Sequence, residues 1–339
     1  MGKVKWFAWV VLGVLVVLLG TDPTSWAAVS SIAELKPSTI KMSSITPLDH
    51  PLMDGLKLFK YLVETNTQEK IKVALFPNSQ LGAEPAVLEM VRGGSVEMAL
   101  SGVALTSAYV KEYIATDVMY LIRDYEHFLK VRGGPIQKEL DAKMETHGMH
   151  VLNSVGLVGT RHILSKKPIR SIGDLQGLKI RTPQAPWAVS GFKALGAFPM
   201  AIQFAEIYTA LQLGTVDALE NPLDWIYAMR FYEVAKNLTL TGHLMGTGGQ
   251  YVANKKWWEG LPVDARKVIE EAAHTGSLYT NTLMITKEQF FRKKMEDVGV
   301  TFIEVDSAPF RKRIDDSIPE MAKAWGGDMG IYEKIKAIK

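Results

Sequence analysis

Arg181 and Asn221 are the side chains whose types and positions best suit the binding of an anion. Arg181 follows the apolar stretch 178–180, and Asn221 follows a second mainly apolar stretch, 216–220. In an open α/β sheet, ligands bind where strands end and loops begin, so we expect both groups at one edge of the sheet. A guanidinium offers a planar fork that can hold a carboxylate through two parallel hydrogen bonds. The pair therefore predicts a site for an organic anion.

Each of these residues also has an ordinary structural explanation. An arginine at a strand end is commonly one half of a surface ion pair. Asn221 precedes Pro222, a combination that caps the start of a helix, where the helix dipole would also favour a bound anion. Arg161 begins another apolar strand, and it too could simply be a solvated charge at the surface. Together, Arg161 and Arg181 would over-neutralise a single carboxylate, which favours a ligand with two acidic or polar ends.

Aromatic residues follow these polar groups closely in the sequence. Trp187, Phe204 and Trp225 are positioned to wall a ligand, although aromatic residues at helical spacing most often belong to the core. Pro183 stiffens the loop after Arg181 and removes a backbone donor, which predicts a fixed ledge beside the guanidinium.

The sequence contains none of the common catalytic motifs. We find no G-x-S-x-G, no H-E-x-x-H, no Walker loop and no G-x-G-x-x-G after a strand. His147 and His150 are three residues apart, but no third ligand stands near them in the sequence. We therefore expect a binding protein that is not an enzyme and that uses no cofactor and no metal.

The amino terminus predicts export. Two lysines precede an apolar run of 14 residues over 6–19, and Ser25 and Ala27 supply the small residues that a signal peptidase requires. The alternative is a permanent membrane anchor, but this run is short against the ~20 residues of a helix that crosses a bilayer. We expect residues 1–27 to be a cleaved signal peptide and the mature protein to be periplasmic.

Charge and cysteine content narrow the class further. The net charge of +3 offers no large basic field, so we expect no nucleic-acid partner. The chain has no cysteine, and therefore no disulfide framework. About 310 residues remain after the predicted signal peptide, enough for two lobes of ordinary domain size. We expect a monomer.

Short strands alternate with helical patterns, which is typical of the α/β class. The predicted strands cover 39–45, 70–76, 96–100, 150–155, 161–165 and 178–181. The predicted helices cover 51–65, 84–93, 125–145, 187–195 and 204–213. Residues 262–298 keep a helical spacing of apolar residues without an internal proline. They form either one helix that crosses between lobes or two helices broken near residues 275–277.

Several longer strings occur together and in order along the chain. They are His50-Pro51, FPNSQLGAE at 76–84, RDYEH at 123–127, GTRHILSKKPI at 159–169, DLQGLKIRTP at 174–183, FAEIYTALQLGTVDALENP at 204–222 and FYEVAKNLTLTGH at 231–243. With these strings the chain resembles the periplasmic solute-binding receptors of tripartite ATP-independent periplasmic (TRAP) transporters, of the dicarboxylate-receptor type.

The resemblance implies a two-lobed periplasmic binding protein fold, with a ligand cleft between the lobes and a long helix that spans both. It places residues 28–158 and 249–281 in lobe I, and residues 159–248 and 282–339 in lobe II. The receptor would bind an organic acid and deliver it to integral-membrane translocator subunits. The alternative is a ligand-sensing receptor that reports closure to a signalling partner.

The resemblance also implies roles for individual residues. Arg181 would clamp the ligand carboxylate, Arg161 and Asn221 would assist it, and Pro183 and Phe204 would line the pocket. Receptors for sialic acid carry a glutamate and an arginine in the loop that here begins with Ser101, and both charges are missing. The resemblance thus implies a C4-dicarboxylate, while the two tryptophans also fit a monocarboxylate with an apolar or aromatic body.

Overall fold

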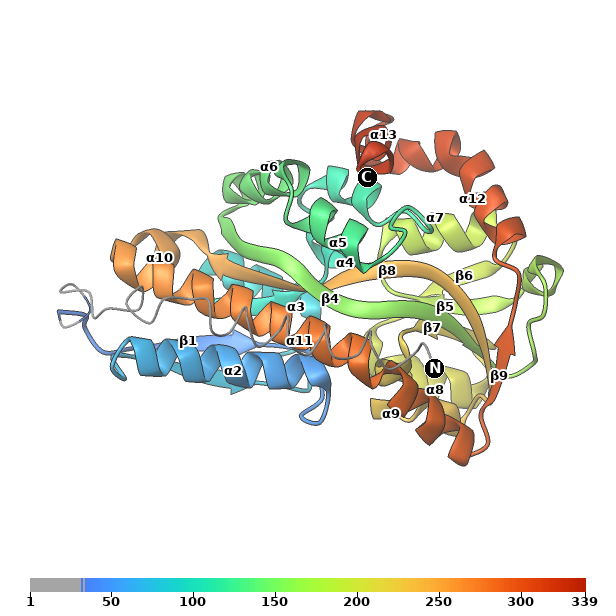
Figure 1. Ribbon diagram of the computed structural model, residues 1–339, viewed down its shortest axis with the longest axis horizontal. Coiled ribbons are helices and arrows are strands. Elements are labelled where there is room, and N and C mark those ends of the chain that lie inside the picture. The colour runs from blue at the N-terminus through green and yellow to red at the C-terminus, as the bar shows by residue number, and fades with distance from the viewer. Residues whose placement is uncertain (1–31, 33) are drawn as a thin grey trace, which may run out of the picture.

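A single sheet of nine strands runs through the protein (Figure 1). The computed structural model describes residue 32 and residues 34–339, so the predicted signal peptide lies outside the described part. In spatial order the strands are β2 (Ile71–Phe76), β1 (Ser38–Ser43), β3 (Met98–Ser101), β8 (Asn237–Asn254), β4 (Met149–Ser165), β7 (Ala218–Asn221), β5 (Lys179–Thr182) and β6 (Phe198–Ala201); β9 (Thr301–Glu304) pairs with β8. The α/β prediction is confirmed.

The long strands β4 and β8 join the two halves of this sheet. They pair with each other along most of their length. At one end β8 also pairs with β3, and at the other end β4 also pairs with β7. Sequence reasoning placed two separate strands at 150–155 and 161–165, whereas β4 is continuous over 17 residues. Its register against β8 shifts several times between Val151 and Ile163. Such irregular pairing disturbs the alternation of side chains, which is why the sequence suggested a gap.

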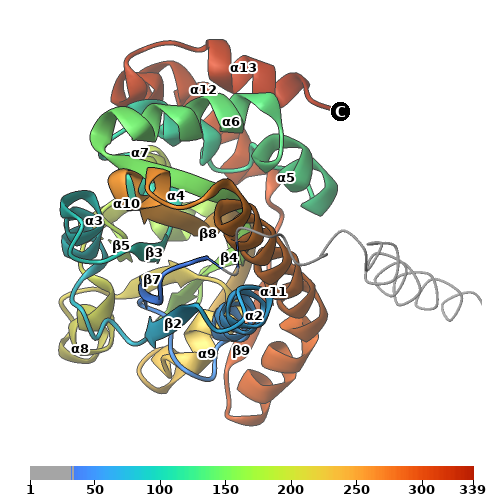
Figure 2. The same cartoon turned by 90° about the vertical axis from the view of Figure 1, so that its left-hand side faces the viewer.

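Helices cover the sheet on both sides (Figures 1 and 2). They are α2 (Pro51–Asn66), α3 (Glu84–Gly93), α4 (Val103–Thr106), α5 (Tyr125–Arg132), α6 (Pro135–Lys143), α7 (Pro186–Ala194), α8 (Ile207–Leu213), α9 (Leu223–Ala228), α10 (Lys255–Glu259), α11 (Val263–Asp297), α12 (Ala308–Met321) and α13 (Gly330–Ala337). None of the helices in the described part has the length and apolar character of a membrane span.

The single helix predicted at 125–145 is wrong. Helix α5 ends at Arg132, with Gly133 as its C-cap, and α6 begins at Pro135. A Cβ at Gly134 would lie 2.3 Å from the carbonyl oxygen of Lys130, so the turn needs glycine there. Proline suits the first turn of the next helix because its missing N–H would have no partner in that turn.

Helix α11 is unbroken over 35 residues, which decides between the two alternatives for 262–298. Gly276 lies inside it because α2 approaches closely there: a Cβ at Gly276 would stand 2.8 Å from the carbonyl oxygen of Gly55. Figure 2 shows the two helices side by side. Farther along α11, the Asn281 amide bonds both Val155 O (2.8 Å) and Leu157 N (2.7 Å) of β4. The helix is therefore fastened to the middle of the sheet.

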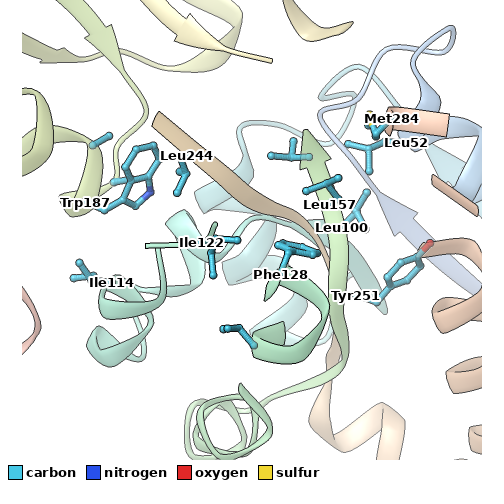
Figure 3. Close-up of a cluster of buried hydrophobic side chains, with 14 of the residues drawn as sticks. Leu52, Leu100, Ile114, Ile122, Phe128, Leu157, Trp187, Leu244, Tyr251 and Met284 are labelled. Carbon is cyan, nitrogen blue, oxygen red and sulfur yellow. The ribbon is translucent and has the colours of Figure 1, made fainter. Parts of the chain in front are cut away.

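One cluster of buried apolar side chains connects the two halves. Figure 3 shows part of it, with Leu52 and Met284 together at one end and Trp187 beside Leu244 at the other. Burying such side chains contributes about 1.5–3 kcal/mol each. This continuous core supports both walls of the cavity described below.

Candidate ligand-binding site

A cavity of about 360 Å³ lies between the two halves of the sheet. Segments that precede or follow strands supply most of its walls. One wall comes from residues 44–46, 79–85 and 100–105, the other from 181–187, 202–205 and 221–225, and the floor from β4 and β8, including Val158, Arg161, Leu244, Gly246 and Gly248. The volume suits a small organic molecule.

Arg181 is buried at the end of β5, with 4% of its surface exposed. Its Nε–H donates to the carbonyl oxygen of Ile202 at 2.9 Å, which fixes the direction of the guanidinium. Burial lowers the pKa of Arg181 to about 9, with a smaller contribution from the nearby charge of Arg161; the charge of Glu220 acts in the opposite direction. No carboxylate in the described part of the chain forms an ion pair with it. Its two terminal nitrogens make no hydrogen bond to a described residue, and Arg181 lines the cavity.

Arg161 is in a different situation, because a protein carboxylate already neutralises it. Its Nη2 donates to Glu220 Oε1 at 2.7 Å, and its Nε contacts Glu220 Oε2. Burial alone would raise the pKa of Glu220, but Arg161 and a hydrogen bond from His243 lower it to about 2. The expectation that two free arginines face one ligand is therefore wrong. Glu220, next to Asn221 in the sequence, was not identified as a site residue.

The orientation of the Asn221 amide follows from Arg161. Arg161 Nη2 donates to Asn221 Oδ1 at 2.9 Å, so Nδ2 is the free donor, and it is buried without a partner in the described structure. The capping interpretation is wrong: α9 begins at Leu223, its N-cap position is Pro222, and no side-chain bond closes it. Asn221 ends β7 and lines the cavity.

The aromatic residues form an apolar wall with polar edges. Trp187 and Trp225 are both buried, and the indole N–H of each has no partner among the described residues. Phe204 packs edge-on against Trp225, with 5.0 Å between ring centroids. Pro183 lines the cavity beside them. A buried indole N–H usually finds an acceptor, so the lack of one at both tryptophans is unusual.

Ser101 does not line the cavity. Its hydroxyl donates to Glu84 Oε1 at 2.6 Å, and the backbone N–H of Gly102 donates to the same oxygen at 2.8 Å. Burial raises the pKa of Glu84, while these two bonds act in the opposite direction. Glu84, the first residue of α3, lines the cavity itself. The sequence analysis included it in a longer string without a role, although its place at a helix start beside a strand end was a usable signal.

The remaining polar groups of the site offer no catalytic pair. Asp117 lines the cavity but is paired with the buried Arg132. His162 and His243 are buried near it, and burial lowers the pKa of both imidazoles, to about 3 for His162. The described residues contain no group of three or more potential ligands that could hold a metal ion. The arrangement is suited to binding.

Comparison with known proteins agrees with this geometry. The model of bacterial extracellular solute-binding proteins, family 7, matches residues 42–324. The C4-dicarboxylate-binding periplasmic protein DctP of Rhodobacter capsulatus is 32% identical over 336 residues, covering 96% of this chain and 97% of that protein. The 2,3-diketo-L-gulonate-binding periplasmic protein YiaO of Escherichia coli K12 is 32% identical over 267 residues, covering 78% and 81%.

Solved structures give the same result. A TRAP periplasmic solute-binding protein from Polaromonas sp. JS666, bound to D-erythronate, superposes with a TM-score of 0.84 at 32% identity, covering 89% of this chain and 99% of that one. Its family consists of transport receptors, and the two-lobed fold predicted from the sequence is confirmed. This chain therefore belongs to family 7 of the bacterial extracellular solute-binding proteins, the solute receptors of TRAP transporters, and is not an enzyme.

Proposed function

We propose that this protein is a periplasmic receptor that binds an organic acid in the cavity and holds the carboxylate with Arg181. The observation that carries the proposal is a buried arginine that, among the described residues, hydrogen-bonds a backbone carbonyl and forms no ion pair. A buried charge without a counter-charge is costly unless it gains a partner. The relatives support an acid as that partner, since DctP binds C4-dicarboxylates and the Polaromonas protein holds D-erythronate.

The other polar groups assist in this proposal. Asn221 and the two indoles of Trp187 and Trp225 donate to ligand oxygens, while Arg161 orients Asn221. Phe204 and Pro183 form an apolar part of the wall. Ser101 does not touch the ligand but fixes the position of the Glu84 carboxylate through its hydrogen bond. Each of these side chains except Ser101 lines the cavity, and the donors among them outnumber the acceptors.

Delivery to the integral-membrane TRAP translocator is the second part of the proposal. We assign residues 28–158 and 249–281 to lobe I, and residues 159–248 and 282–339 to lobe II, with the cavity between them. A ligand that contacts both lobes favours the closed form by its difference in affinity for the two forms. The protein acts as a monomer after removal of residues 1–27. No feature of the described residues favours the signalling alternative.

A thermal-shift screen of the purified protein against a library of carboxylic acids tests the proposal. A ligand that binds the native state raises the melting temperature with its concentration. Calorimetric titration of each hit with Arg181→Met should show an affinity loss of about 2–5 kcal/mol, as expected when one partner of a buried charge pair is removed. Arg170→Met, at an exposed arginine outside the cavity, is the matched control. Undiminished binding by Arg181→Met contradicts the proposal.

A further inference from the structure

Among the described residues that line the cavity, Arg181 is the one cation that forms no ion pair with a carboxylate. Its charged lining residues are Glu84, Asp117, Arg161 and Arg181. Arg161 is paired with Glu220, and Asp117 with Arg132. Arg181 and Glu84 are left, each without an oppositely charged partner in the described structure. Because the Arg161–Glu220 and Asp117–Arg132 ion pairs carry no net charge, the electrostatic field that a ligand meets depends on Arg181 and Glu84.

These two side chains come from opposite walls. Arg181 ends β5, in the half of the sheet formed by β7, β5 and β6, whereas Glu84 begins α3 beside β3, in the half formed by β2, β1 and β3. A ligand whose carboxylate binds Arg181 therefore presents its other end toward Glu84.

Glu84 is held in place as an acceptor. Its Oε1 receives the Ser101 hydroxyl and the Gly102 N–H, and no described group bonds its Oε2. The amino terminus of α3 would by itself favour an anion, but Glu84 already supplies the negative charge there. Pro85, the next residue, has no N–H to offer. Burial raises the pKa of Glu84, while the bonds from Ser101 and Gly102 favour its ionised form. In that form this wall accepts a hydrogen bond from a ligand and repels a carboxylate.

The cavity lining is largely apolar. It includes Ile45, Leu100, Val158, Ile202 and Leu244, together with the polar side chains of Ser44, Thr46, Ser79, Gln184 and Gln203. An apolar wall gives little compensation for a second charge, because a charge needs polar partners when it leaves water.

Resting on the function proposed above, we infer that the ligand carries one carboxylate, bound by Arg181, and a hydrogen-bond donor at its far end that meets Glu84. Glu84 is then a specificity-determining residue that excludes a second carboxylate. Selective sites commonly combine an attractive contact for the right ligand with a repulsive one for its rival. The donor is a hydroxyl or an ammonium group, and the experiment separates the two.

Acids that differ only at the far end test the inference. Succinate is compared with 4-hydroxybutanoate and 4-aminobutanoate, adipate with 6-hydroxyhexanoate and 6-aminohexanoate, and meso-tartrate with D-erythronate. Calorimetric titration of the wild-type protein should show the donor-ended acid binding about tenfold or more tightly than its dicarboxylate, because like charges brought together cost several kcal/mol. The better of the hydroxy and amino acids identifies the donor.

Glu84→Gln supplies the second arm. Its amide oxygen can still accept from Ser101 and Gly102, while the negative charge is gone and an N–H faces the cavity. The variant should bind the dicarboxylates about tenfold more tightly than the wild type and the donor-ended acids less tightly. Glu89→Gln, on the exposed side of the same helix, should change neither. A merely structural effect of the substitution would weaken both kinds of acid together.

Each outcome decides the inference. Equal or tighter wild-type binding of any dicarboxylate in the series overturns it, and so does unchanged selectivity in Glu84→Gln. If no acid of the series binds, the tightest acid of the library takes its place: a dicarboxylate overturns the inference, and a monocarboxylate that Glu84→Gln weakens supports it. If no carboxylic acid of the library binds, the proposed function itself fails.

Discussion

Replacing Arg181 with methionine should make the ligand-free protein more stable while removing its ability to bind an acid. Methionine keeps much of the length and apolar stem of arginine but carries no charge. In the folded protein Arg181 is 4% exposed, and its guanidinium has no carboxylate partner in the described structure. Folding therefore transfers a charge out of water without supplying a counter-charge, which is unfavourable.

The size of the effect follows from the pKa of Arg181. Burial lowers this pKa from the ordinary value of an arginine to about 9, and each pKa unit corresponds to about 1.4 kcal/mol. Keeping the charge thus costs the folded state roughly 5 kcal/mol at most at neutral pH, and water inside the cavity reduces this. The variant also leaves the carbonyl of Ile202 without its donor, which offsets about 1–2 kcal/mol. We expect a net stabilisation of about 1–3 kcal/mol.

The lowered pKa of Arg181 also determines how the stability difference between the variant and the wild type changes with pH. Because the folded-state pKa lies below that of the unfolded chain, the penalty is complete below about pH 9 and shrinks as the pH rises toward the unfolded value. The stability advantage of Arg181→Met should therefore be constant between pH 7 and 8 and smaller at pH 10.

Urea unfolding followed by tryptophan fluorescence measures this difference, since five of the eight tryptophans lie outside the predicted signal peptide. Both proteins are first unfolded, dialysed free of bound acid and refolded, because bound ligand would stabilise only the wild type. Arg313→Met, at an exposed arginine of α12, should stay within about 0.5 kcal/mol of the wild type. A lower urea midpoint for Arg181→Met than for the wild type would refute the argument.

Two further variants test the structure around the site. Glu220→Gln removes the partner of Arg161 and should lower the free energy of unfolding in urea by roughly 3 kcal/mol at pH 7. Since the folded-state pKa of Glu220 is lowered to about 2, the stability advantage of the wild type should fade as the pH falls from about 4.5 toward 2. An equal stability difference at pH 7 and pH 2.5 would contradict the pairing. Gly276→Ala places a Cβ 2.8 Å from the carbonyl oxygen of Gly55 and should lower the free energy of unfolding by about 1–3 kcal/mol. Gly93→Ala, in open space at the end of α3, should raise it by up to about 1 kcal/mol. A stabilised Gly276→Ala would mean that α2 and α11 can separate without penalty.

The parts of the fold that the sequence predicted correctly are those in which one local pattern decides the outcome. Helix α11 keeps its apolar spacing without an internal proline, so its helical character could be predicted, and one unbroken helix was one of the two alternatives. The strands that end at Thr182 and Asn221 could be located because apolar runs stop at polar residues there. Their meeting at one cavity then follows from a general property of α/β sheets.

The parts that the sequence did not reveal depend on distant partners or on close contacts. The break between α5 and α6 follows from the space available at Gly134, and glycine in a helical pattern is a weak signal by itself. Asn221-Pro222 looks like a helix cap, but the bond from Arg161 determines what the amide does. Glu84 was visible only as part of a string, because its role depends on a wall formed by residues far from it in the sequence.

The two arginines show why residue type alone does not give the charge of a site. Arg161 and Arg181 both emerge near the same edge of the sheet, yet the β4–β7 register sets His162 opposite Asn221 and so brings Arg161 to Glu220. No described carboxylate forms an ion pair with Arg181, which bonds a backbone carbonyl instead. Folding thus pairs Arg161 with Glu220 and leaves Arg181 without a carboxylate partner among the described residues. On the proposed function, the ligand supplies the missing carboxylate, so the same buried charge that lowers the stability of the empty protein provides affinity for the acid.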